Sequence, residues 1–194
     1  MKKSIVLITL SISALLSGCL GVQKTQEITI ESGNNELLEV LCAFEEIPRT
    51  GDATRIINVI DNDNWNPFTS GETYKVIYEI KTENSETGKQ HTLSISVLDT
   101  TAPLVQLKTG QAEISVCYSE NIEKLKQDVL DQIINAVVIT DNSSQFPLTP
   151  NLYDIFLTQF DDKAVDRKQE VIFSVKDLAG NITESSIVLK LIRQ

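Results

Sequence analysis

The densest cluster of oxygen-bearing side chains in the sequence is the tetrapeptide Asp61-Asn62-Asp63-Asn64. Calcium takes about six to eight oxygen ligands, and alternate side chains on a tight loop supply several of them. Asp61 and Asp63 are therefore candidate calcium ligands. Further oxygens would come, if folding brings them close, from Asp99, Asp141 and Asp161-Asp162. An Asx-rich turn between two strands explains the same cluster, and both interpretations stay open.

Cys42 and Cys117 are candidates for a disulfide bond, which an extracytoplasmic location permits. They lie in different halves of the chain, so a bond between them would join the two halves. Strand alternation directs the side chain of Cys42 inward. It directs the side chain of Cys117 to the face opposite the apolar residues Ile114 and Val116. Two separate thiols are the alternative.

Trp65 lies in the turn-like segment 64–68 and is a candidate contact residue for a ligand or partner. An apolar plug over the end of a domain is the alternative role. Tyr74 and Tyr78 alternate in phase with Val76, which predicts that both tyrosines pack in a core.

Composition argues against most catalytic chemistry. The chain has a single histidine, His91, which has no recognisable partner and is expected to be exposed, so a zinc site or catalytic triad lacks its residues. No glycine-rich phosphate loop is present. The net charge of -10 excludes a general nucleic-acid binder, because neutralising phosphates requires an excess of Lys and Arg. We expect neither enzymatic activity nor a nucleic-acid partner.

The N-terminal sequence is typical of a targeting signal. Lys2 and Lys3 precede an apolar run, residues 5–16, that is too short to span a membrane and is typical of a secretory signal. The run ends in Leu16-Ser17-Gly18-Cys19, which resembles the bacterial lipobox. That resemblance implies removal of residues 1–18, acylation of Cys19 and a lipidated tether over residues 19–27. The membrane, reached through the N-terminal lipid, is then a partner, and the protein is extracytoplasmic at the bacterial cell membrane or outer membrane.

Period-2 alternation dominates the rest of the chain and predicts strands. The clearest examples are residues 38–44, 74–81, 93–97, 171–176 and 187–191. One segment differs, because Ile122, Leu125, Val129 and Ile133 have helical spacing. We expect a short amphipathic helix near residues 121–135, capped by Ser119 or Asn121, with a strand as the alternative.

The strand pattern occurs twice. Residues 76–81 (VIYEIK) recur as residues 171–176 (VIFSVK), and each copy is followed by a turn and another alternating strand. An internal repeat predicts two copies of one small domain. The junction is expected at Thr100-Thr101-Ala102-Pro103, which gives domains at residues 28–101 and 102–194.

Three segments resemble the immunoglobulin-like repeats of bacterial surface proteins: SGETYKVIYEI (70–80), ISVLDTTAP (95–103) and EVIFSVKDLAGNITESSIVLKLI (170–192). The resemblance implies an all-β chain of two tandem immunoglobulin-like β-sandwich domains, the second with the short helix. The family's Asp-x-x-Gly-Asn turn is present at residues 177–181, where Gly180 supplies a positive φ. The first copy has KTENSETGK (81–89) instead. Members of the family act mostly as stalks, spacers and adhesive modules.

These observations favour a lipid-anchored cell-surface protein that acts non-catalytically as a spacer or as a module binding a surface protein or glycan. A calcium-dependent adhesive or structural module is one alternative. An accessory scaffold subunit of a membrane-associated complex is another, because open sandwiches leave strand edges available to partners.

Overall fold

The computed structural model describes residues 7–11, 25–47 and 55–193. The chain divides into two compact units, Met1–Asp99 and Thr100–Gln194. The predicted acylation site Cys19, most of the predicted signal peptide and most of the tether lie outside the described residues. Among the described helices, none combines the length and the apolar character needed to cross a membrane.

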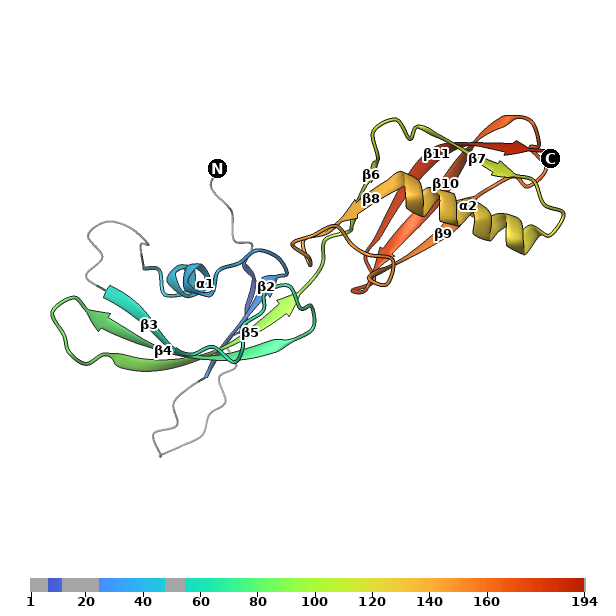
Figure 1. The fold of residues 1–194 in the computed structure, drawn as a ribbon. Helices are drawn as coiled ribbons and strands as arrows, with labels where there is room; N and C mark the ends of the chain where they lie inside the picture. The colour runs from blue at the N-terminus through green and yellow to red at the C-terminus, as the bar shows by residue number, and fades with distance from the viewer. Residues whose placement is uncertain (1–6, 12–24, 48–54, 194) are drawn as a thin grey trace. The chain divides into compact units, whose positions relative to one another are not determined.

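The first unit contains one mixed sheet with the strand order β1-β2-β5-β4-β3. Its elements are β1 (Leu7–Ser11), β2 (Gln26–Glu31), α1 (Leu37–Phe44), β3 (Arg55–Asp61), β4 (Thr73–Thr82) and β5 (Lys89–Leu98). β2 pairs in parallel with β5, whereas β3, β4 and β5 form an antiparallel meander. Helix α1 covers one face of this sheet (Figure 1). β1, antiparallel to β2, falls within the segment predicted to be a signal peptide.

Helix α1 corrects one expectation. The alternation of residues 38–44 predicted a strand, but this segment is helical. The apolar residues Leu37, Val40, Leu41 and Phe44 also follow the i, i+3, i+4, i+7 spacing of a helix, and that stripe packs against the sheet. Every residue of the segment except Glu39 is apolar, so both periods fit it, and packing against the sheet selected the helix.

The core of the first unit is built by alternate side chains of its strands together with the apolar stripe of α1. Its buried members are Ile28, Ile30, Leu37, Val40, Leu41, Tyr74, Val76, Tyr78, Leu93, Ile95 and Val97. Tyr74 and Tyr78 are buried, which confirms the expectation that both tyrosines pack in the core.

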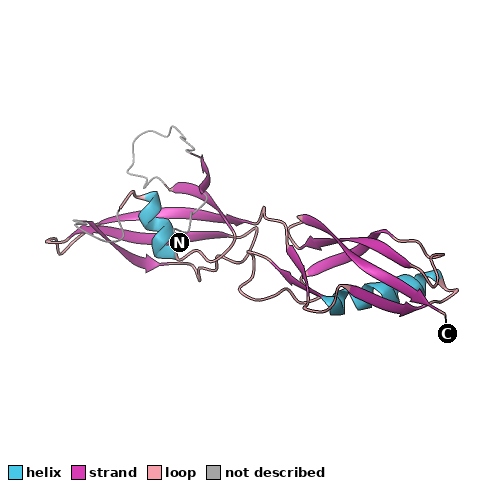
Figure 2. Ribbon diagram, turned by 90° about the horizontal axis from the view of Figure 1, so that it is seen from above, coloured by secondary structure: helices cyan, strands magenta, loops and turns pink. Residues whose placement is uncertain are grey.

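The second unit contains a four-stranded sheet, a two-stranded sheet and a helix. Its elements are β6 (Leu104–Leu107), β7 (Glu113–Cys117), α2 (Ile122–Ala136), β8 (Val137–Thr140), β9 (Tyr153–Gln159), β10 (Lys168–Asp177) and β11 (Ile182–Ile192). The larger sheet has the order β7-β11-β10-β9, and β6 pairs with β8. Figure 2 shows α2 lying along the strands of this unit. The buried faces of both sheets and of α2 enclose one core.

Helix α2 confirms the helix expected near residues 121–135. The side chain of Asn121 accepts a hydrogen bond from the backbone N–H of Lys124 at 3.1 Å, so Asn121 is the N-cap. Leu125, Val129 and Ile133 are fully buried on the face that meets the sheet. The amphipathic spacing therefore identified both the helix and its packing face.

The two units share one topology, which explains the repeat in the sequence. In each, a strand is followed by a helix and then by an antiparallel meander whose last strand pairs in parallel with the first. The repeated segments, residues 76–81 and 171–176, lie on the equivalent strands β4 and β10. The prediction of a mostly β chain built from duplicated units is confirmed.

Candidate functional site

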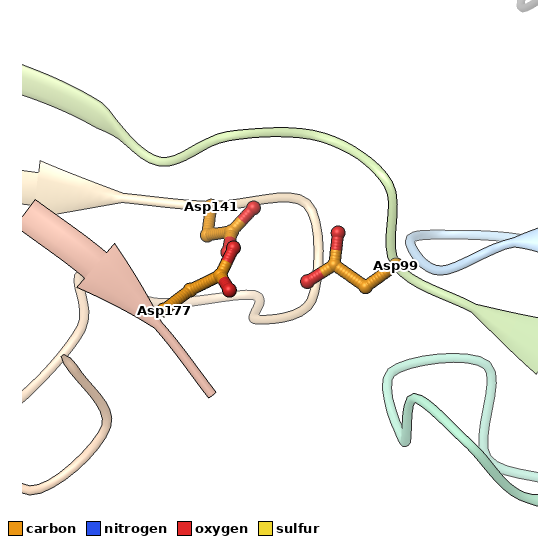
Figure 3. A group of neighbouring side chains, drawn as sticks. All are labelled: Asp99, Asp141 and Asp177. Carbon is orange, nitrogen blue, oxygen red and sulfur yellow. The ribbon is translucent and has the colours of Figure 1, made fainter. Parts of the chain in front are cut away.

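Two carboxylates meet at one pole of the second unit. Asp141 follows β8 directly, and Asp177 is the last residue of β10. A carboxylate oxygen of one lies within 4.8 Å of a carboxylate oxygen of the other, and Figure 3 shows the two side chains turned toward each other. Like charges at this separation repel, and a cation placed between the two carboxylates would relieve that repulsion.

The turn that follows Asp177 holds its carboxylate in place. The backbone N–H of Asn181 donates to Asp177 Oδ1 at 2.8 Å, and the Asn181 side-chain amide donates to Asp177 Oδ2 at 3.0 Å. Gly180 has a φ of 97°, as the turn motif predicted, because a residue with a Cβ adopts this conformation only with strain. Asp177 is also almost fully buried.

Asp141 is fixed by its own loop. Its Oδ1 accepts a hydrogen bond from the backbone N–H of Asn142 at 2.6 Å, and its Oδ2 accepts one from the hydroxyl of Ser143 at 3.0 Å. Burial raises the pKa of the Asp141 carboxyl above its ordinary value, and the neighbouring charge of Asp177 adds to that rise. These two effects outweigh the hydrogen bonds, which act in the opposite direction.

The N-terminal segment of the second unit runs beside this turn. The Asn181 side chain donates to the carbonyl oxygen of Thr101 at 3.2 Å, and the Thr183 hydroxyl donates to that of Pro103 at 2.6 Å. Asp99, the last residue of the first unit, precedes Thr101 by two residues, and Figure 3 draws its side chain as well.

Only part of the predicted oxygen cluster meets here. Asp141 was among the expected calcium ligands, whereas Asp177 was expected only to be the first residue of the turn at 177–181. Asp161-Asp162 follow the other end of β9, about 20 Å away by strand rise, because Tyr153 at the near end pairs with Asp177. The Asp-x-x-Gly-Asn turn was the signal that placed Asp177 at this pole.

The Asp61–Asn64 loop has hydrogen bonds that suit a turn. Asp61 Oδ1 accepts from the backbone N–H of Asp63 at 3.1 Å, and Asp63 Oδ2 accepts from that of Lys75 at 3.3 Å. Asp63 and Asn64 have positive φ values, which Asp and Asn tolerate better than most residues. Within the described ranges, no third acidic, histidine or cysteine side chain joins Asp61 and Asp63. The geometry matches the Asx-turn interpretation.

Trp65 packs against the core of the first unit. Its ring meets Tyr74 edge-on with centroids 5.2 Å apart, and its indole N–H donates to the carbonyl of Asn35 at 3.2 Å. The side chain is half-buried. These contacts correspond to the apolar plug that was the alternative to a ligand-contact role.

A polar network that the sequence did not indicate joins α1 to the sheet of the first unit. The buried Tyr78 hydroxyl donates to Glu45 Oε1, and His91 Nδ1 lies 3.8 Å from the same oxygen. The His91 ring also stacks on Tyr78 at 5.4 Å, so the expectation that His91 is exposed was wrong. Arg55 Nη2 lies 3.5 Å from Glu45 Oε2. Burial, the hydrogen bond to Glu45 and the Glu45 charge raise the pKa of the Tyr78 hydroxyl far above its usual value.

The two cysteines lie in different units. Cys42 is half-buried on α1, and Cys117 is exposed at the end of β7. No disulfide joins them in the described structure.

Comparisons with known proteins identify neither a family nor a curated relative. No family model matches the chain, and no curated protein matches it. Among solved structures, it is similar to the first two cadherin repeats of human mucin-like protocadherin, with 12% identity, a TM-score of 0.32, and coverage of 87% of this chain and 96% of that chain.

Two longer cadherin structures give similar values. For cadherin domains 3–6 of protocadherin gamma B2, the identity is 10%, the TM-score 0.29, and the coverage 86% of this chain and 45% of that chain. For the human desmocollin-1 ectodomain, the identity is 12%, the TM-score 0.27, and the coverage 86% and 35%. The chain thus spans less than half of these two proteins.

Proposed function

We propose that this protein is a lipid-anchored, extracytoplasmic protein of bacteria that acts non-catalytically, as a spacer or as a module that binds a surface protein or glycan. The anchor is Cys19, and the body is the pair of duplicated β units. Within the described residues, the grouped titratable side chains bond to their own unit, as Asp177 does to Asn181 and Glu45 does to Tyr78. Such groups stabilise turns and helix packing, which supports a structural role.

The observation that carries this proposal is the duplicated topology placed after an N-terminal segment that ends in Leu-Ser-Gly-Cys. Inward side chains of both units form two apolar cores. Burying a Leu, Ile or Phe stabilises a fold by roughly 1.5–3 kcal/mol, so these cores account for the two units as stable, self-contained modules.

Cell fractionation tests the anchor. The wild-type protein should sediment with membranes and be cleaved by protease added to intact cells or spheroplasts. Cys19→Ala should move the protein to the soluble extracytoplasmic fraction, because a lipid acceptor is lost. Cys117→Ala changes an exposed thiol of the second unit and should leave the distribution unchanged. Wild-type protein in the cytosol, with its N-terminus intact, would overturn the proposal.

A second candidate function is a calcium-stabilised module, favoured by the Asp141–Asp177 pair. A cation between the two carboxylates would relieve their repulsion and bind only the folded state, so it should raise the melting temperature. Calorimetry in millimolar calcium and in chelator should therefore differ by several degrees for the second unit, and Asp177→Asn should abolish the difference. Equal melting temperatures of the wild-type protein in the two buffers would exclude this function.

A further inference from the structure

The outer edge of β2 is occupied by β1. Strand β2 pairs in parallel with β5 on its inner side and antiparallel with β1 on its outer side. Strand β1 (Leu7–Ser11) lies within residues 1–18, which the predicted processing before Cys19 removes. Removal of β1 leaves the outward backbone N–H and C=O groups of β2 without a strand partner. The processed protein therefore presents a sheet edge that the full-length chain covers.

The backbone of β2 is well suited to strand addition. Its six residues, Gln26–Glu31, all pair with β5 without a bulge, so the strand is regular over its whole length. The strand contains neither Lys nor Pro, the residues that often protect a sheet edge. At the opposite edge of the sheet, by contrast, β3 is bulged between Val59 and Asp61. A regular edge of this length can accept an extended segment.

The pairing with β1 shows which kind of strand fits this edge. The register places Leu7 and Leu10 opposite the two buried isoleucines of β2. It places the hydroxyl residues Thr9 and Ser11 opposite positions on the other face of β2. Ile8 is the extra residue of a bulge that brings both leucines into this register. The fitting strand is therefore antiparallel and uncharged, with aliphatic residues on the core face and small hydroxyl residues on the other face.

The charges of β2 select against other strands. Glu27 and Glu31 share the face that points away from the core, so an acidic side chain opposite either of them is repelled. Antiparallel pairing of two β2 strands about Thr29 places Glu27 opposite Glu31 at both ends, and like charges directly opposite each other are destabilising. An uncharged partner strand fits the edge better than a second copy of β2.

The second unit has no such added strand. Its strand β7 is equivalent to β2, because it pairs in parallel with the last strand of its unit, β11. Within the described residues, no strand pairs with the outer side of β7. The occupied edge is thus a property of β2 and not of the shared topology, and β7 serves as an internal control.

We propose that the outer edge of β2 is a strand-acceptor site: in the processed protein it binds, by β-strand addition, an uncharged extended segment of a partner protein that takes the place of β1. This proposal rests on the proposed function, because processing before Cys19 frees the edge. Gln26 follows Cys19 by seven residues, which span at most about 25 Å when fully extended. The acceptor edge thus stays close to the lipid anchor, and the partner segment is one presented at the same membrane surface.

Hydrogen exchange of the full-length chain tests the acceptor edge independently of lipidation. Translation in a membrane-free extract keeps residues 1–18, so the wild type retains β1. Thr9→Pro removes β1 from the sheet, because proline interrupts strand pairing. The probe is a synthetic peptide of residues 6–12, VLITLSI, flanked by lysines for solubility. The control peptide is identical except for proline at the position of Thr9.

Thr9→Pro should speed the exchange of β2 amides roughly tenfold or more, and the probe should reverse most of this change. The control peptide should have no effect, and neither peptide should alter exchange in β7. A probe that fails to restore the protection of β2, or equal exchange of β2 in the wild type and Thr9→Pro, would overturn the proposal. Loss of protection in β4 would show that the first unit needs β1 to fold, and would overturn it as well.

Disulfide trapping tests the register of the added strand. In Thr9→Pro protein, Thr29→Cys should capture a probe that carries cysteine at the position of Thr9, because these two positions lie directly opposite each other. Glu27→Cys, on the same face of β2, is the matched control and should give a yield roughly threefold lower or less. Equal yields would overturn the register.

Sedimentation of the Thr9→Pro protein tests the choice of partner. This variant should remain monomeric without the probe, whereas dimerisation through β2 would assign the edge to a second copy and overturn the partner assignment. Failure of the anchor is distinguishable from these outcomes, because exchange, trapping and sedimentation use protein that has not met a membrane, whereas anchoring is measured by cell fractionation.

Discussion

The change Asp141→Asn is predicted to stabilise the second unit when no cation is added. Asp141 carries a charge within 4.8 Å of the Asp177 carboxylate, and burial penalises that charge further. The amide keeps the shape of the side chain and one acceptor oxygen for the N–H of Asn142. It removes the repulsion without opening a cavity.

The size of this stabilisation follows from the distance between the two carboxylates. Two unit charges at about 4.8 Å repel by roughly 1 kcal/mol at the dielectric constant of water and by about 3 kcal/mol at an effective value near 20. Asp141 is only half-buried, so we expect the lower end, about 1 kcal/mol. For a unit of this size, that raises the melting temperature by roughly 4–8 °C.

The pH dependence has a defined sign. The pKa of Asp141 is higher in the folded than in the unfolded state, so its charge destabilises the fold at pH values above the folded pKa. This penalty is lost as the pH falls through the folded pKa toward the unfolded value. The advantage of Asp141→Asn over the wild type should therefore be largest near neutral pH and should shrink on acidification.

Differential scanning calorimetry in chelator measures the effect, and hydrogen exchange of β10 and β11 peptides assigns it to the second unit. Asp154→Asn is the control, because Asp154 is an exposed carboxylate on neighbouring β9. That variant should change the free energy of unfolding by less than about 0.5 kcal/mol, or roughly 2–4 °C at most, as surface substitutions do. A melting temperature of Asp141→Asn at or below that of the wild type would refute the argument from charge repulsion.

Three further predictions concern local interactions. Tyr78→Phe removes the buried donor to Glu45 and should lower the free energy of unfolding of the first unit by about 1–3 kcal/mol. Urea unfolding followed by the fluorescence of Trp65 measures this change. An unchanged urea midpoint would show that the hydrogen bond does not stabilise the unit. Gly180→Ala forces a Cβ into a φ of 97° and should cost about 1–2 kcal/mol in the second unit, measured by calorimetry, whereas a neutral effect would mean that the turn rearranges. Asn121→Ala removes the cap of α2 and should cost about 1 kcal/mol, visible as faster hydrogen exchange in its first turn; unchanged exchange would contradict the capping role.

Sequence periodicity predicted the strands that carry the repeat. The segments around Val76 and Val171 alternate because one sheet face is buried, and they occupy equivalent strands of the two units. Helix α2 was predictable for a similar reason, since its apolar residues repeat with a single helical period and Asn121 marks its start.

Helix α1 was not predictable from the same signal. Its eight residues are too few to separate a period of 2 from one of 3.6, so tertiary packing decided the outcome. In the second unit, β8 pairs with β6, and the strand equivalent to β3 is β9, although their sequences share no visible pattern.

The polar interactions likewise include some that the sequence predicts and some that it does not. Asp177 and Gly180 belong to a local turn motif, and local motifs are visible in a sequence. The contact of Glu45 with Tyr78 and His91 joins residues more than 30 positions apart, so it depended on sheet register and on helix α1. Separation in sequence explains why that network was missed.

The mass of the N-terminal tryptic peptide tests the central claim most directly. If residues 1–18 are removed and Cys19 is acylated, membranes should yield the peptide 19–24, CLGVQK, carrying a diacylglycerol on its thiol, because trypsin cleaves after Lys24. An unmodified peptide 4–24, starting after Lys3, would show that the N-terminus is neither processed nor lipidated and would contradict the account of an anchored surface protein.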